Sequence, residues 1–153
     1  KNHIYRVLTY TMHFLDGDDN YISVIATALV YHDIGLWSAG TLAYLKPGVE
    51  LSRKECEFMF STDSKNLLEA IILNHHKIWP VQGSPIVEAV RKADWIDASY
   101  GVFNKGMPRK YIAAVQAAIP NAGFHKTLIE FGPRLHGSNV FAILSEIITI
   151  FKW

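Results

Sequence analysis

The sequence predicts an all-α fold in a single domain. Apolar residues recur every three to four positions through most of the chain, as they do along one face of a helix. No segment shows the sustained alternation typical of a strand, and capping residues, prolines and glycines separate the apolar segments. The chain has 153 residues, half of them hydrophobic, which is enough to bury one sizeable core.

The first part of the chain contains two expected helices. The spacing of apolar residues predicts one helix from His3 to Leu15 and a second from about Tyr21 to the His32-Asp33 pair, ending near Gly35. Residues 37–49 receive no element, because glycines and a proline bracket a short aromatic segment.

Three helices are expected in the middle of the chain. Ser52-Arg53-Lys54-Glu55 has the pattern of a capping box and predicts a helix that starts there and runs through Phe60. The next helix is expected to be capped by Asp63 or Ser64 and to be ended by Pro80. Ser84-Pro85 predicts a sharp start for a helix that runs to about Phe103.

The C-terminal part, residues 106–153, is expected to be a variable helical region that shapes the pocket, since the motifs described below lie within residues 3–98. Pro108 predicts the start of a helix through Ile119. Residues 127–135 are ambiguous because Gly132-Pro133 interrupts them, and a last helix is expected from Ser138 or Asn139.

Charge and cysteine content narrow the class of protein. A net charge of +1 gives no signal for nucleic acid. The single cysteine, Cys56, excludes an intrachain disulfide and favours a cytoplasmic location, and we expect it to be buried. No apolar run approaches the roughly 18 residues typical of a membrane span. The first residue is Lys1 rather than Met, which leaves open an N-terminal segment upstream.

Four polar side chains fall on apolar helical faces: His3, His32, Asp33 and Asp94. A lone inward histidine is more often a hydrogen-bonded core residue, and a lone inward aspartate is more often a cap or an ion-pair partner. Together they supply nitrogen and oxygen donors from three helices, a set that suits a divalent first-row metal ion. Since a buried carboxylate needs a cation, we expect a metal site here.

These residues, in this order, resemble the HD domain superfamily, in which a His, an adjacent His-Asp pair and a later Asp lie on successive helices. The similar segments are His3-Ile4-Tyr5-Arg6-Val7, Ala28-Leu29-Val30-Tyr31-His32-Asp33-Ile34-Gly35 and Arg91-Lys92-Ala93-Asp94-Trp95-Ile96-Asp97-Ala98. The resemblance covers about the first two-thirds of the chain. It implies an HD-type helical bundle and a phosphohydrolase that depends on a divalent metal (Mn, Mg, Ni, Co, Fe or Zn). The implied substrate is a small phosphomonoester or phosphodiester, with nucleotides among the candidates.

The resemblance also gives roles to the pair His75-His76, which would bind a second metal ion or the substrate phosphate. Alternatively, the pair ends a helix beside Lys77, where positive charge suits the helix dipole. Two-metal members of the superfamily usually have another histidine between the central motif and this pair. No histidine lies between Asp33 and His75, so a one-metal site is the alternative.

Further roles follow for charged neighbours. Asp33, or a nearby carboxylate, is expected to orient or deprotonate a metal-bound water. Arg6, three residues after His3, is expected to bind a phosphate oxygen, with a plain surface cation as the alternative. Lys77 is a further candidate for the substrate. Asp97, one turn from Asp94, is expected to accept a hydrogen bond from a ligand histidine or else to be solvated.

The remaining histidines and aromatic residues match no motif. His13, His125 and His136 are expected at the surface, whereas most large aromatic residues are expected in the core: Trp37, Tyr44, Trp79, Trp95 and Tyr100. Other functions stay open on the same site. HD-like folds also include a mononuclear zinc hydratase for small nitriles and di-iron oxygenases, and a non-catalytic metal-binding regulatory module is a third reading.

Overall fold

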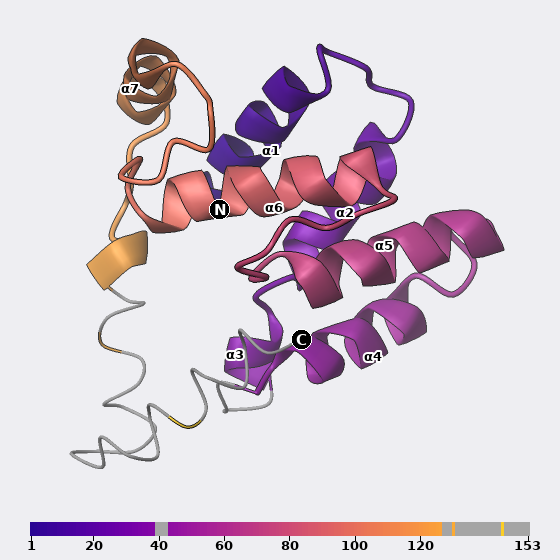
Figure 1. The fold of residues 1–153 in the computed structure, drawn as a ribbon. Coiled ribbons are helices and arrows are strands. Elements are labelled where there is room, and N and C mark those ends of the chain that lie inside the picture. Colours follow the sequence, from indigo (N-terminus) through magenta and orange to yellow (C-terminus); the bar gives the residue numbers. More distant parts are fainter. Residues whose placement is uncertain (39–42, 127–129, 131–144, 146–153) are drawn as a thin grey trace.

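The computed structural model describes residues 1–38, 43–126, 130 and 145. Within these residues it contains seven helices and no strand (Figure 1), which confirms the predicted all-α class. The helices are α1 (Asn2–Phe14), α2 (Ile22–Tyr31), α3 (Gly35–Ser38), α4 (Leu45–Glu55), α5 (Thr62–Asn74), α6 (Pro85–Ala98) and α7 (Arg109–Ala118).

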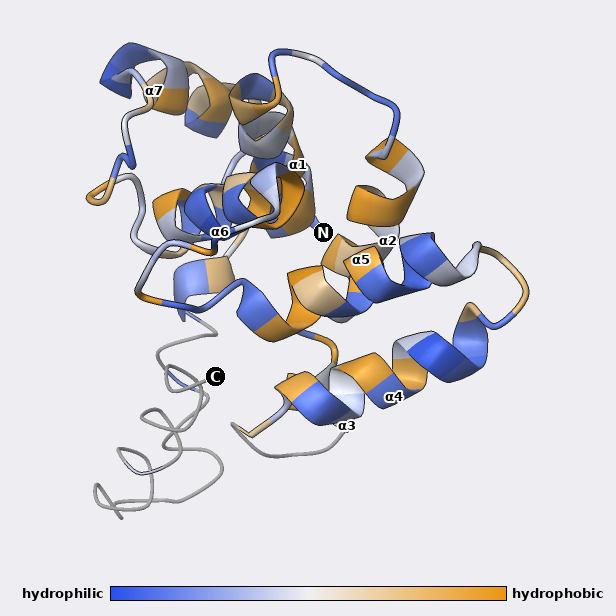
Figure 2. Ribbon diagram, turned by 45° about the vertical axis from the view of Figure 1, so that its right-hand side comes forward, coloured by the Kyte–Doolittle hydropathy of each residue, from blue (hydrophilic) through white to orange (hydrophobic). Residues whose placement is uncertain are grey.

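Helix α6 connects the two sides of the bundle. It packs against α1 on one side and α5 on the other, while α5 also contacts α2 and α4, and α7 lies against α1 (Figure 1). Hydrophobic and hydrophilic residues both occur along α4 and α5, as expected of helices with one buried side (Figure 2). The fully buried apolar side chains that join the helices include Val7, Ile25, Leu29, Ile71, Ile72, Val90 and Ile96.

Several predicted helix boundaries are confirmed. Ser84 Oγ accepts a hydrogen bond from the Val87 amide at 3.4 Å, with Pro85 in the first position of α6. Helix α7 begins directly after Pro108, as predicted. The far end of α6 was predicted near Phe103, which is wrong: the helix ends at Ala98, and Gly101, with φ +81°, closes it by donating to the Ile96 carbonyl at 2.7 Å.

The predicted capping box at residues 52–55 is wrong, because these residues form the end of α4 rather than the start of a helix. Ser52 Oγ donates to the Val49 carbonyl at 2.8 Å inside the helix. Pro47 lies in the first turn, where its missing N–H costs no intrahelical hydrogen bond. Gly48 lies close to α2, because a Cβ there would be 3.0 Å from the Tyr31 carbonyl oxygen. The proline and glycine therefore mark packing positions rather than a loop.

The start of α5 is at Thr62, with Ser61 as its cap, whereas Asp63 or Ser64 was expected. Ser61 has an extended backbone and its Oγ accepts from the Ser64 amide at 3.3 Å. The helix ends at Asn74, so His75 and His76 follow its last turn. The expected elements within residues 127–135 and from residue 138 lie outside the described residues, apart from residues 130 and 145. None of the described helices combines the length and apolar character that crossing a membrane requires.

Candidate metal centre

Six histidine and aspartate side chains from four helical segments converge in the bundle. They form three overlapping sets whose ligand atoms lie within 4.8 Å of one another: His3, His32 and Asp94; His32, Asp33 and His75; and His75, His76 and Asp94. His3 comes from α1, Asp94 from α6, and the other four follow the ends of α2 and α5. The structure therefore brings together all four predicted ligands and the histidine pair.

The closest approaches have the spacing of ligands around one ion. His3 Nε2 lies 3.0 Å from His32 Nε2 and 3.3 Å from Asp94 Oδ1. Asp33 Oδ2 lies 3.1 Å from His32 Nε2. Protein ligands lie roughly 2.0–2.2 Å from zinc and similar ions, which puts neighbouring ligand atoms about 3 Å apart. The nearest donor atoms of this cluster thus have spacings compatible with a shared metal ion.

In three of the histidines, a hydrogen-bond acceptor on the side away from the cluster determines which ring nitrogen carries the hydrogen. His32 Nδ1 donates to the Leu29 carbonyl and His75 Nδ1 to the Ile72 carbonyl, both at 2.7 Å. His3 Nδ1 donates to Asp97 Oδ2, also at 2.7 Å. In the neutral rings, each Nε2 then carries a lone pair directed into the cluster. His75 Nε2 is buried and has no hydrogen-bond partner, as expected of a nitrogen placed for a metal ion.

The carboxylates of the cluster favour a positive charge where the imidazole Nε2 atoms converge. Burial alone would lower the pKa of His3, but hydrogen bonds with Asp94 and Asp97 outweigh it and raise this pKa to about 10. Burial would raise the pKa of Asp33, yet the neighbouring His32 and the other imidazoles hold it well below its usual range. In the same way, the pKa of Asp94 falls to about 2. Two ionised carboxylates thus share a site that holds either a proton or a metal cation.

Asp97 and Arg6 hold the far side of His3. Asp97 accepts from the Arg6 Nε at 2.5 Å and from its Nη2 at 2.8 Å, besides accepting from His3. Arg6 Nη1 donates to the carbonyls of Ile119 and Pro120, both at 3.1 Å. Arg6 is only 1% exposed, so the prediction that it binds a phosphate oxygen is corrected. Its position beside His3 was expected, but the guanidinium points to Asp97 and the end of α7.

Tyr44 is the site residue that the sequence did not indicate, since it was expected to be an ordinary core aromatic. Its hydroxyl donates to Asp33 Oδ1 at 2.9 Å and makes a short contact with His76 Nε2. Burial and the charge of Asp33 raise the pKa of this hydroxyl well above its ordinary value. Nothing in the local pattern could have identified Tyr44, because it reaches the cluster only through the packing of α4.

The segment after α7 also covers part of the cluster. Phe124 stacks on His3, with ring centroids 4.0 Å apart and planes 9° from parallel. His125 is partly buried and its Nε2 donates to the Asp97 backbone carbonyl at 2.7 Å, so the expectation of a surface position for His125 is wrong. His13 is exposed, as expected, and His136 lies outside the described residues.

Access to solvent is uneven around the cluster. The Asp33 and His76 side chains are 16% and 21% exposed, whereas His3, His32, His75 and Asp94 are at most 6% exposed. Lys77 directly follows the histidine pair, and its carbonyl accepts from Arg91 and Trp95, which ties this backbone to α6. A small molecule would therefore approach the cluster at the edge formed by Asp33 and His76.

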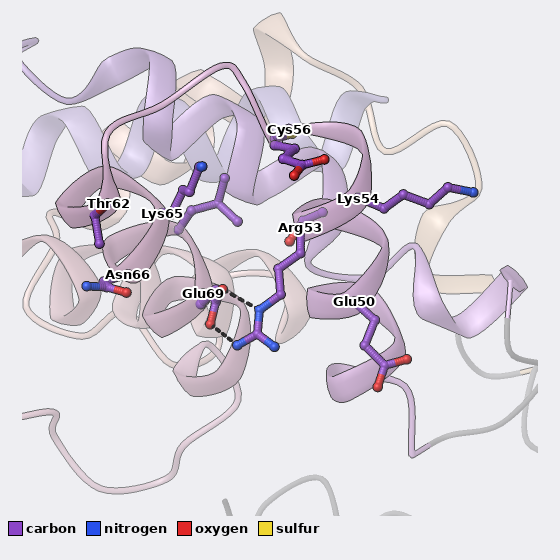
Figure 3. Close-up of a pocket in the computed structure, with 11 residues that line it drawn as sticks. Glu50, Arg53, Lys54, Cys56, Thr62, Lys65, Asn66 and Glu69 are labelled. Atoms are coloured by element: carbon purple, nitrogen blue, oxygen red, sulfur yellow. Dashed lines mark hydrogen bonds and ion pairs between the residues drawn. The ribbon is translucent and has the colours of Figure 1, made fainter.

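A groove of about 540 Å³ between α4 and α5 is a separate feature (Figure 3). None of the six clustered side chains lines it. Arg53 and Glu69 face each other across the groove and form two hydrogen bonds of 2.6 Å. Arg53 and Glu69 thus pair with each other, and the groove shares no residue with the cluster.

Comparison of the chain with protein-family models, curated proteins and solved structures finds no match. The arrangement offers at least three imidazole nitrogens and two carboxylates to a cation, and the Asp33 and His76 side chains are partly exposed. Such a site suits Lewis-acid chemistry on an oxygen-rich substrate.

Proposed function

We propose that the protein is a metal-dependent phosphohydrolase of the HD type that acts on a small phosphomonoester or phosphodiester. The observation that carries the proposal is the convergence of His3, His32 and His75, each with its Nδ1 bound elsewhere and its Nε2 directed at the carboxylates. Lone pairs and anions that share one buried space repel each other unless a cation lies between them. The order of the ligands along the chain and the all-α fold are in keeping with the HD type.

The residues proposed to hold the metal ion are His3, His32, Asp33 and Asp94. When bound, a divalent ion would lower the pKa of a water molecule and polarise a phosphoryl oxygen. Asp33 is partly exposed and its low pKa keeps it ionised, so we assign it the role of orienting this water through a carboxylate oxygen. Asp97 and Arg6 keep His3 in position, and Lys77 remains the candidate for contact with the substrate.

The histidine pair favours a second ion over direct binding of phosphate. His75 is fully buried, so its ring is closed to a phosphate that approaches from solvent. His76 lies at the open edge, where burial and the neighbouring His75 lower its pKa to about 3 and keep the ring neutral. A neutral imidazole suits a metal ion better than it suits an anion.

Hydrolysis of chromogenic phosphomonoesters and phosphodiesters, with Mn²⁺, Co²⁺, Ni²⁺ or Mg²⁺ added, tests the proposal. We expect activity that falls at least about 100-fold in His32→Ala and Asp94→Ala variants, since both remove a metal ligand. His13→Ala, which changes an exposed histidine outside the cluster, is the matched control and should keep full activity. A metal-loaded protein that hydrolyses no phosphate ester would contradict the proposal.

A mononuclear zinc hydratase is the second candidate, favoured by the lack of a histidine between Asp33 and His75. A di-iron oxygenase and a non-catalytic regulatory module use the same ligand set. Elemental analysis separates them: one zinc ion per chain favours the hydratase, two iron ions the oxygenase, and exchangeable manganese, magnesium or nickel the phosphohydrolase. The partial exposure of Asp33 favours an enzyme over a fully buried structural site. The single cysteine supports a cytoplasmic setting for the proposed enzyme.

A further inference from the structure

Tyr44 places a hydroxyl group between the two halves of the cluster. The residue directly precedes α4 and is only 2% exposed. Its Oη contacts Asp33, whose Oδ2 faces His32 and His3 in one half, and His76, which lies with His75 and Asp94 in the other half. The close approach depends on Gly35, because a Cβ at that position would lie 2.3 Å from the Tyr44 carbonyl oxygen.

The Tyr44 hydroxyl has one proton, so it can donate in only one of these two contacts. Asp33 is a carboxylate and can only accept, so the Tyr44 O–H donates to Asp33 Oδ1. The contact between Tyr44 Oη and His76 then requires that His76 Nε2 carries a hydrogen and donates it. In the neutral ring, His76 Nδ1 is left with the lone pair, and it lies 3.7 Å from Asp94 Oδ2.

The same hydroxyl also orients Asp33. Because Oδ1 is held by Tyr44, Oδ2 remains directed at His32 Nε2, 3.1 Å away, and at His3 Nε2, 3.6 Å away. His75 Nε2 lies 3.7 Å from the Oδ1 atom that Tyr44 binds. One phenol thus orients a ligand in each half.

We propose that Tyr44 is a positioning residue for a second divalent metal ion, which His75 Nε2, His76 Nδ1 and Asp94 Oδ2 would bind. This inference rests on the proposed metal function. His3, His32 and His75 have their Nδ1 partners away from the cluster, whereas His76 has its Nε2 in contact with the Tyr44 hydroxyl. Loss of the hydroxyl should therefore weaken the second position more than the first, where Asp33 is one of four proposed ligands.

Titration of the metal-free protein with Co²⁺, followed by visible absorption and calorimetry, tests the proposal. The wild type should bind two equivalents. Tyr44→Phe should bind the second equivalent about 10- to 100-fold more weakly, the usual cost of losing a partner that orients a metal ligand, and should weaken the first equivalent less. Tyr10→Phe is the matched control, since Tyr10 is fully buried and its hydroxyl faces the Ile112 carbonyl; both equivalents should remain.

A second measurement reads the tautomer directly. Long-range ¹H–¹⁵N spectra of the metal-free wild type should show the hydrogen of His76 on Nε2, and Tyr44→Phe should shift it toward Nδ1. A hydrogen on Nδ1 in the wild type would overturn the proposal, even if the Tyr44→Phe variant fails to fold.

The outcomes separate this inference from the proposed function. A wild type that binds one Co²⁺, or a Tyr44→Phe variant that binds two as tightly as the wild type, overturns the role of Tyr44 and leaves a one-metal phosphohydrolase intact. A protein with the expected Co²⁺ and tautomer results that hydrolyses no phosphate ester retains the role of Tyr44 and loses the proposed reaction.

Discussion

Asp97 Oδ2 lies 2.7 Å from His3 Nδ1, so a carboxylate on α6 sets the protonated nitrogen of a proposed metal ligand on α1. The same carboxylate neutralises the buried Arg6 guanidinium. One side chain thus joins the metal centre to the packing of α1 against α6, and loss of its charge should affect both.

Asp97→Asn should lower the free energy of unfolding by about 3 kcal/mol, because Arg6 would stay buried without its counter-charge. Urea unfolding of the metal-free protein measures this change. Glu69→Gln is a control, since it removes a carboxylate from an ion pair at the surface and should change stability little. Equal stability of the two variants would argue against the role of Asp97.

Metal binding should stabilise the fold. At a Mn²⁺ concentration 100-fold above its dissociation constant, the stabilisation is about 2.7 kcal/mol, which corresponds to a rise in Tm of roughly 5–10 °C. Thermal unfolding with and without a chelator measures the rise. His32→Ala and Asp94→Ala should lose it and His13→Ala should keep it. A rise that persists in Asp94→Ala would place the ion elsewhere.

Glu88 should make stability depend on pH. It accepts from the Val81 amide at 2.9 Å and from Arg91 through two hydrogen bonds of 2.7 Å. Burial would raise the pKa of Glu88, but these bonds lower it below its unfolded value of about 4.3. Its contribution is therefore present above about pH 4.3 and is lost as pH falls through the lower folded pKa.

Glu88→Gln should accordingly cost about 1–2 kcal/mol at pH 7, and the difference from the wild type should shrink in acid. Chemical unfolding of both proteins at pH 7, 5 and 3 measures the difference. A gap that stays constant over this range would mean that the charge of Glu88 contributes nothing.

Phe124→Ala should loosen His3, because it removes the ring that stacks on this ligand at 4.0 Å. We expect a loss of roughly 1–3 kcal/mol in stability and weaker binding of the first Co²⁺ equivalent. Phe58→Ala is the control, since Phe58 is 94% exposed. Unchanged Co²⁺ binding in Phe124→Ala would show that the stacking does not hold the ligand.

Gly35→Ala should disturb the site through Tyr44. The added methyl would lie 2.3 Å from the Tyr44 carbonyl oxygen, so α3 and the start of α4 would have to separate. We expect lower stability and a weaker second Co²⁺ equivalent, as in Tyr44→Phe. A Gly35→Ala protein with the stability and the two-equivalent binding of the wild type would show that this contact can relax without moving Tyr44.

The sequence by itself determined the helical class and the positions of the four central ligand candidates. Apolar residues such as Val7 and Leu29 follow the 3.6-residue helical repeat. Since His3, His32 and Asp94 continue these apolar faces, the repeat predicts that they point inward. The cap at Ser84 likewise depends on neighbours in the chain and was predicted correctly.

Only the tertiary structure decided where Arg6, Tyr44 and His125 belong. Periodicity tells whether a side chain faces the core, but not which distant group it meets there. Arg6 meets Asp97, 91 residues away, and Tyr44 meets His76, 32 residues away. These contacts depend on how α1, α4 and α6 pack, since a hydrogen bond requires its two partners within about 3 Å and helix spacing along the chain does not set that distance.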